Sequence, residues 1–185
     1  MIIKKINPKM LYLEKVSYKH INLGWFDWVN ASENVRVLNN PPYRYTKSQL
    51  EDYLKKIKLK GDLMFAVRNK ITKEYIGNIK INDIDFFHKN CGYGRLIGSQ
   101  NKKGIGYGQL MLYKICEYAF DKLKMNKIFS PCYADNLKSL YSNLQFGMRI
   151  SGYFKNHFKK NNKFKDVYYL ELTRQEFKEI KKKYK

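Results

Sequence analysis

Three glycines occupy alternate positions immediately before an amphipathic segment of the chain. They are Gly104, Gly106 and Gly108, within the stretch SQNKKGIGYGQ that covers residues 99–109. Glycine inside the start of a helix costs roughly 1 kcal/mol relative to alanine, so three of them need a reason. Because glycine has no Cβ, the backbone can approach a ligand closely, and the first N–H groups of a helix are unpaired donors that attract anions. The pattern therefore predicts a strand, a phosphate-binding turn and a helix in succession.

The spacing of these glycines differs from two well-known phosphate-binding loops. The dinucleotide fingerprint is G-x-G-x-x-G and the P-loop ends in G-K-[S/T], and neither pattern occurs in this stretch. A phosphorylated ligand other than NAD or ATP is favoured, with Lys102 and Lys103 adding positive charge at the rim. A flexible loop that ends in a helix is the alternative interpretation of the same glycines.

Hydropathy along the rest of the chain switches between the two-residue period of strands and the 3.6-residue period of helices. Strands are expected at 11–18, 62–69, 74–87, 91–98, 127–134, 149–158 and 164–172, and helices at 21–32, 47–60, 109–124 and 136–146. Thr46 and Gln49 form a capping-box pattern before the second helix, and residues 178–185 are expected to be a frayed helix end. This order predicts a mixed α/β (α+β) fold. Since there is no internal repeat or linker, residues 1–185 are expected to form a single domain.

The formal net charge of the chain is +21. Such a charge suits a polyanionic partner, for example nucleic acid, an acidic membrane surface or a phosphate-bearing ligand. The lysines are scattered over nearly every segment, however, so the codon usage of an AT-rich genome is the favoured explanation of the charge. The chain has three cysteines, Cys91, Cys116 and Cys132, and their spacing is not that of metal ligands. We therefore expect neither a disulfide framework nor a zinc site. With no long apolar run and no signal-peptide pattern at the N-terminus, we expect a cytoplasmic protein that does not contact the membrane.

Three segments carry a resemblance to a known superfamily. They are NKKGIGYGQLMLYKICEYAFDKLKMNKI, CYADNLKSLY with LQFGM, and YFKNHFKKNNKFKDVYYLEL. In their order and spacing they resemble the GNAT acetyltransferase superfamily, over nearly the whole chain. Within it, the chain looks most like the branch of ribosomal-protein N-acetyltransferases and of amino-sugar acetyltransferases of surface-polysaccharide pathways. The resemblance implies a mostly antiparallel central sheet, splayed in the middle and flanked by helices, and acetyl-CoA as the cofactor.

The resemblance also implies which residues bind the cofactor. The family pattern [Q/R]-x-x-G-x-[G/A], which offers backbone N–H groups to a pyrophosphate, maps onto Asn101, Gly104 and Gly106, although Asn101 departs from Gln or Arg. Donors are expected from Lys102, Lys103, Gly104, Ile105, Gly106, Tyr107 and Gly108. Main-chain groups of Leu96, Ile97 and Gly98 would bind the pantetheine arm and polarise the thioester carbonyl. Asn136 and Ser139 match the N-x-x-[S/A] element that faces the cofactor arm.

The catalytic assignments are less direct. Acetyl transfer needs a neutral amine, hence a base or a water chain, and an acid for the thiolate. The resemblance maps the acid to Tyr141, five residues before Phe146 in the element Y-x-K-x-G-F, with a core tyrosine as the alternative. Tyr141 lies two residues closer to Asn136 than usual, and Gln145 replaces the family glycine. The family glutamate falls at Gly92, which leaves His88, Asp85 or a water relay to backbone carbonyls as the base.

Acceptor specificity is expected from the first two helices, the loop between them and the terminal hairpin. The candidate substrate-binding residues are Trp25, Tyr43, Arg44 and Tyr45, since aromatic rings stack on sugars or bases and cations attract phosphate. Core packing is the alternative for the tryptophans. The favoured acceptor is a small-molecule amine, a nucleotide-linked amino sugar. Acetylation of a protein N-terminus is the second hypothesis, and a catalytically weak, basic nucleic-acid-binding module is the third. A homodimer is a further expectation, and nucleic acid is the less favoured partner.

Overall fold

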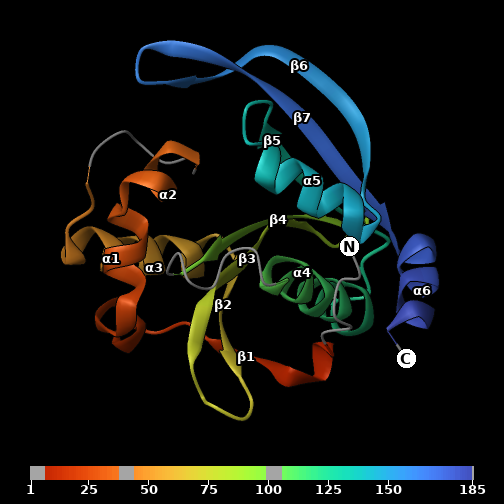
Figure 1. Cartoon of the computed structure of the whole chain (residues 1–185), viewed down its shortest axis with the longest axis horizontal. Coiled ribbons are helices and arrows are strands. Elements are labelled where there is room, and N and C mark those ends of the chain that lie inside the picture. The colour runs from red at the N-terminus through yellow and green to blue at the C-terminus, as the bar shows by residue number, and fades with distance from the viewer. Residues whose placement is uncertain (1–6, 38–43, 99–105, 185) are drawn as a thin grey trace.

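The computed structural model describes residues 7–37, 44–98 and 106–184. Its strands form one seven-stranded sheet in the order β1-β2-β3-β4-β5-β7-β6 (Figure 1). The strands are β1 (Leu11–Lys15), β2 (Leu63–Asn69), β3 (Tyr75–Asp85), β4 (Asn90–Ile97), β5 (Lys127–Tyr133), β6 (Arg149–Lys160) and β7 (Lys163–Thr173). All neighbours pair antiparallel except β4 and β5, which are parallel. The expected mixed α/β fold with a mostly antiparallel sheet is confirmed.

Helices cover both faces of this sheet. The described helices are α1 (Phe26–Asn30), α2 (Ser32–Val37), α3 (Lys47–Leu59), α4 (Tyr107–Glu117), α5 (Leu137–Phe146) and α6 (Arg174–Lys183), with short turns η1 (Pro8–Met10), η2 (Ile21–Trp25) and η4 (Tyr118–Lys122). The larger apolar core joins the sheet to α4, α5 and α6, and a smaller one joins β2–β4 to η2, α1 and α3. We call these the α4 face and the α1 face of the sheet.

The helix boundaries follow from capping residues. The capping box of Thr46 and Gln49 is present at the start of α3, as the sequence predicts. A second box, formed by Thr173 and Glu176, starts α6. The C-terminal segment is therefore a capped helix that buries Phe177 in the core, rather than only a frayed end, because its apolar residues recur at helical spacing on one face.

The last two strands form a long hairpin, which we call the arm. The turn residues Asn161 and Asn162 both have positive φ, 48° and 58°, a conformation that asparagine tolerates and that matches the twist of a two-residue hairpin. In Figure 1 the arm rises from the base of the sheet and arches over α5 towards the side of α2.

Two glycines fix the position of α1 against the end of β4. An added Cβ would lie 2.6 Å from the Trp28 ring at Gly98 and 2.9 Å from it at Gly24, whose φ is +124°. The same indole packs on Tyr75 with ring centroids 4.5 Å apart. Trp28 therefore fits between two backbone segments that only glycine leaves open, which holds the first helix at the edge of the strand that ends in the candidate site.

We expect Gly98→Ala to lower the free energy of unfolding by about 1–3 kcal/mol, because the new methyl group overlaps the Trp28 ring. The measurement is urea denaturation followed by tryptophan fluorescence. Gly94→Ala is the matched control on the same strand: an added Cβ at Gly94 meets nothing within 4 Å, so a change within about 0.5 kcal/mol is expected. An equal loss of unfolding free energy in the two variants would show that the packing of Trp28 does not depend on the absence of a side chain at Gly98.

Candidate active site

The parallel strands β4 and β5 separate after a short paired segment. Their described pairing consists of Asn90 with Lys127, Cys91 with Ile128 and Gly92 with Phe129. Beyond it, β4 continues to Ile97 and β5 to Tyr133, and Figure 1 shows the two strands running apart, β4 towards α1 and β5 up under the arm. We call residues 93–97 and 130–133 the strand divergence. The expected splay in the middle of the sheet is confirmed.

The backbone of β4 presents only alternate residues to this divergence. The N–H of Gly98 donates to the carbonyl of Ile76 on β3, with an N–O distance of 2.8 Å. Because the bonding direction alternates along an antiparallel strand, the main-chain groups of Leu96 also point to β3, and those of Tyr93, Arg95 and Ile97 point to the β5 side. Of the three main-chain positions expected to bind the cofactor, only Ile97 therefore faces the divergence. The main-chain groups of Tyr93 and Arg95 face it as well, whereas those of Leu96 and the N–H of Gly98 point to β3.

Helix α4 begins at Gly106, close to this side of β4. Gly106 is the N-cap in a left-handed conformation, with φ +90°, and no side chain caps the helix. Among the described residues, no side chain accepts from the first N–H groups, those of Tyr107 and Gly108, as an anion-binding helix start requires. The other residues expected in the phosphate turn, Asn101, Lys102, Lys103, Gly104 and Ile105, lie outside the described residues.

A polar network joins β4, α4 and α5. The Arg95 guanidinium donates to the Gly108 carbonyl (2.6 Å), the Ser142 hydroxyl (3.1 Å) and the Asn143 side-chain oxygen (2.8 Å). The Tyr93 hydroxyl donates to the same Asn143 oxygen at 2.8 Å, and burial raises the pKa of Tyr93 to about 12. Tyr93 therefore stays protonated near neutral pH and acts as a fixed donor. The network holds the first turn of α4 at a set distance from β4.

Helix α5 starts where β5 ends. Asn136 is its N-cap, and the Asn136 side-chain oxygen accepts from the Ser139 N–H at 3.4 Å. Asn136 and Ser139 are both expected to face the pantetheine part of the cofactor. The structure places them together where β5 ends, beside the strand divergence. Cys132 is buried beside them, in agreement with the expectation that it belongs to the core.

The end of α5 corrects the register on which the acid was assigned. Gly147 ends the helix in a left-handed conformation, with φ +115°. If Gly147 is aligned with the glycine of the resembled Y-x-K-x-G-F element, Met148 takes the place of Phe. Counting back puts Asn143, and not Tyr141, at the tyrosine position, which removes the two-residue discrepancy in spacing. The Tyr141 side chain is 59% exposed, on the side of α5 away from its buried residues.

The two side chains expected as bases lie at the paired end of β4. The Asp85 carboxylate accepts from the N–H groups of Phe87 (2.9 Å) and His88 (2.7 Å), which shapes the turn between β3 and β4. His88 is exposed and packs on the Phe87 ring. The strands separate only beyond Gly92, several residues further along β4, so the geometry does not bring Asp85 or His88 to the divergence. An added Cβ at Gly92 would lie 2.7 Å from the Asn82 amide, which occupies the space a longer side chain there would need.

The residues expected to bind the acceptor have different surroundings. Trp25 is only 2% exposed and packs in the smaller core, so its assignment as a substrate-binding residue is wrong: the apolar side of this segment is what attaches it to the sheet. Arg44 and Tyr45 line a cavity of about 620 Å³ between α1 and the start of α3. Tyr43 lies outside the described residues.

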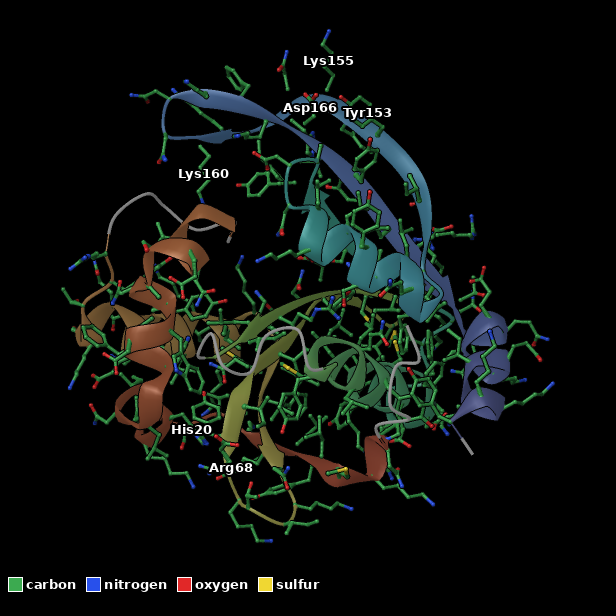
Figure 2. The ribbon with its side chains drawn as sticks, viewed as in Figure 1. His20, Arg68, Tyr153, Lys155, Lys160 and Asp166 are labelled. Carbon is green, nitrogen blue, oxygen red and sulfur yellow. The ribbon has the colours of Figure 1, made fainter. Side chains whose placement is uncertain are left out.

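The sequence did not indicate a buried lysine at the tip of the arm. Lys160 is 6% exposed, and its ammonium donates to the Val35 carbonyl of α2 at 2.5 Å and lies 5.6 Å from the Tyr133 ring centroid. Figure 2 shows Lys160 pointing from the arm to α2. Burial lowers the pKa of Lys160. Within a run of lysines no sequence signal distinguishes this one, because the fold alone decides which of them meets α2.

Comparisons with known proteins agree with this geometry. Residues 11–149 match the family model described as acetyltransferase (GNAT) domain. An uncharacterized N-acetyltransferase, YnaD, of Bacillus subtilis is 32% identical over 78 residues, which cover 42% of this chain and 44% of that relative. Acetyltransferase PseH of Campylobacter jejuni is 32% identical over 103 residues, 54% of this chain and 57% of the relative. The crystal structure of spermidine N-acetyltransferase from Vibrio cholerae in complex with CoA and spermine superposes with a TM-score of 0.82 at 19% identity, over 91% of this chain and 98% of the other.

We expect Arg95→Lys to lower the free energy of unfolding by about 1–3 kcal/mol, because a lysine cannot make the three hydrogen bonds to α4 and α5 and leaves buried acceptors unpaired. Chemical denaturation measures this loss. In Arg149→Lys, at a side chain that is 56% exposed, the same change of residue should cost less than about 1 kcal/mol. A loss in Arg95→Lys no larger than in Arg149→Lys would contradict the role given to the network.

Proposed function

This chain belongs to the GNAT acetyltransferase family, whose model matches most of its length, and we propose that it acetylates the primary amine of a nucleotide-linked amino sugar. Acetyl-CoA is the donor, and the protein is an N-acetyltransferase. The finer placement in the branch that modifies sugars of surface polysaccharides rests on the resemblance of the sequence. We also propose that residues 1–185 act as one domain in the cytoplasm and that the protein is a homodimer. Among the described residues, no helix has the length and apolar character to cross a membrane.

The observation that carries the proposal is the separation of β4 and β5 beside a helix that starts in glycine. The main-chain groups of Tyr93, Arg95 and Ile97 face a region without a described strand partner, and buried backbone groups need hydrogen-bond partners. An extended amide chain such as pantetheine satisfies them, while the uncapped N–H groups of Tyr107 and Gly108 suit a phosphate. The residues present therefore fit coenzyme A. When bound, acetyl-CoA supplies an acyl group activated as a thioester.

We assign removal of the amine proton to a water relay along β4. Gly92 lacks the carboxylate of the family pattern, and Asp85 and His88 lie in the turn at the paired end of the strand. The carbonyl oxygens of Tyr93, Arg95 and Ile97 face the divergence, so those that pantetheine leaves unpaired can accept from ordered water, which carries the amine proton to solvent. The N–H groups of the same residues can donate to a carbonyl in which negative charge develops.

The charge of the chain supports an anionic acceptor. A net charge of +21 repels a polyamine or a basic peptide and attracts a diphosphate. The distal half of the arm, residues 153–166, carries five lysines and one carboxylate. A nucleotide-linked amino sugar combines a primary amine with the negative charge that this surface favours.

Release of free thiol from acetyl-CoA, measured across a panel of amines, tests the proposal. We expect turnover with a nucleotide-linked amino sugar to exceed turnover with spermidine or with a peptide N-terminus by at least tenfold, and to fall with rising salt because the attraction is screened. Turnover with spermidine alone would reject the amino sugar. Absence of coenzyme A binding in calorimetry would reject the enzyme assignment itself.

Tyr141→Phe tests the register of α5. Because the Tyr141 side chain lies on the exposed side of the helix, we expect turnover to stay within about twofold of the unmodified protein. Gly106→Val is the comparison variant: a valine is strained at φ +90° and crowds the helix start, so the Kd for coenzyme A should rise at least tenfold. A tenfold loss of turnover in Tyr141→Phe with unchanged coenzyme A binding would restore Tyr141 as the acid.

A further inference from the structure

Four rings gather on one face of the arm. Phe154 packs against Tyr169 with ring centroids 4.9 Å apart and against His157 at 5.1 Å, and His157 packs against Phe158 at 4.7 Å. The Tyr169 hydroxyl and the His157 Nε2 lie 3.4 Å apart. Phe154 is 45% exposed, and His157 is exposed as well. We call these residues the aromatic shelf. Exposed rings that gather in one cluster mark a candidate binding surface.

Register places the shelf on the α1 face of the sheet, the face on which Gly94 is open. Phe154 pairs with Val167 and Phe158 with Lys165, and side chains of paired residues share a face. Tyr169 pairs with Pro131, which lies on the part of β5 beyond its last contact with β4. The shelf thus flanks the strand divergence on the side of β5. At Gly94, on the side of β4, an added Cβ would meet nothing within 4 Å.

Lysines border the shelf towards the tip of the arm. Lys160 and Lys163 are cross-strand partners, and Lys165 is paired with Phe158, so all three lie on the same face as the shelf. Lys160 reaches α2 and Lys165 binds Asp135 at 2.6 Å. Figure 2 shows Lys155 and Asp166 along the upper edge of the arm and Lys160 below it. The Asp135 carboxylate offsets the charge of Lys165, which leaves Lys163 as the exposed cation of the three.

We propose that the aromatic shelf binds the base of the nucleotide-linked acceptor, and that the exposed Lys163 beside it binds the diphosphate. This inference rests on the proposed function and adds the subsite that selects the acceptor. Any nucleotide base can stack on an exposed aromatic ring, because every base has a planar π-face. Cationic side chains bind phosphate oxygens. The arrangement leaves the amine end of the acceptor to reach the open surface at Gly94 while the nucleotide lies along the arm.

Pairing of the arm with a second copy of the chain is disfavoured by the same residues. β6 is one of the two edge strands of the described sheet, but its ladder is interrupted between Phe154 and Phe158. Irregular edges and lysines prevent strand addition, and two arms of like charge repel each other. The charge beside the shelf instead complements a polyanion.

The test uses the full-length protein and uridine diphosphate as the probe, titrated by calorimetry with and without saturating coenzyme A. We expect Phe154→Ala and His157→Ala each to raise the Kd of uridine diphosphate at least fivefold, and to leave the Kd of coenzyme A unchanged. The turn between β3 and β4 offers a matched control. Phe87 is 87% exposed and packs on His88 with centroids 4.8 Å apart, so Phe87→Ala removes a comparable ring from a Phe–His pair at another site and should leave both Kd values unchanged.

The outcomes distinguish a failure of the nucleotide subsite from a failure of the proposed acetyltransferase function. If uridine diphosphate competes with coenzyme A, or binds equally well in Phe154→Ala and Phe87→Ala, the shelf is not a nucleotide site, although thiol release with an amino sugar would still support the proposed function. If a single-stranded oligouridylate binds far more tightly than uridine diphosphate, with a steep salt dependence, the shelf binds RNA and the inference is overturned. An acceptor KM that rises at least fivefold in Phe154→Ala, with the acetyl-CoA KM unchanged, would support it. Thermal melting of each variant verifies that it is folded.

Discussion

The separation of two parallel strands is the constraint on which the rest of this structure depends. Where two adjacent strands of a sheet separate, their main-chain donors and acceptors are left unpaired inside the molecule. Each unpaired group costs a folding free energy comparable to that of a lost hydrogen bond. Here β4 and β5 stay together only as far as Gly92 and Phe129. The protein can maintain this arrangement because surrounding elements hold the two strands independently, and a ligand with its own amides can complete the hydrogen bonds.

Different contacts hold the two strands on either side of the divergence. β4 pairs with β3 along its length, and Arg95 connects it to the first turn of α4 and to α5 through buried hydrogen bonds. β5 pairs with β7, which belongs to the arm, and Lys160 ties the tip of the arm to α2. The site is therefore bounded by elements that are far apart in the sequence. Its two faces also differ, since the α4 face carries the glycine helix start and the α1 face carries the open glycine of β4 and the aromatic shelf.

Glycine positions, where a side chain is absent, shape this site as much as the side chains do. Gly106 allows a left-handed N-cap, and Gly98 makes room for the Trp28 ring. Gly92 stands where the family pattern has a carboxylate, and the Asn82 amide fills the adjacent space. The catalytic chemistry we propose accordingly relies on main-chain groups of β4, whose positions are set by the sheet. Selection of the acceptor then falls to surface residues of the arm.

The sequence by itself determined the mixed α/β class, the capping of α3, the splayed sheet implied by the family resemblance, and the glycine start of α4. These features depend on local patterns, namely periodicity, turn chemistry and glycine spacing, which adjacent residues specify. Tertiary structure alone decided that β4 alternates its main-chain groups between β3 and the divergence, that Gly147 sets the register of α5, and that Trp25 is core. It also decided that His88 lies at the paired end of β4 while His157 lies on the arm beside Tyr169. Such relations depend on strand register and on contacts between distant segments, and no local pattern carries that information.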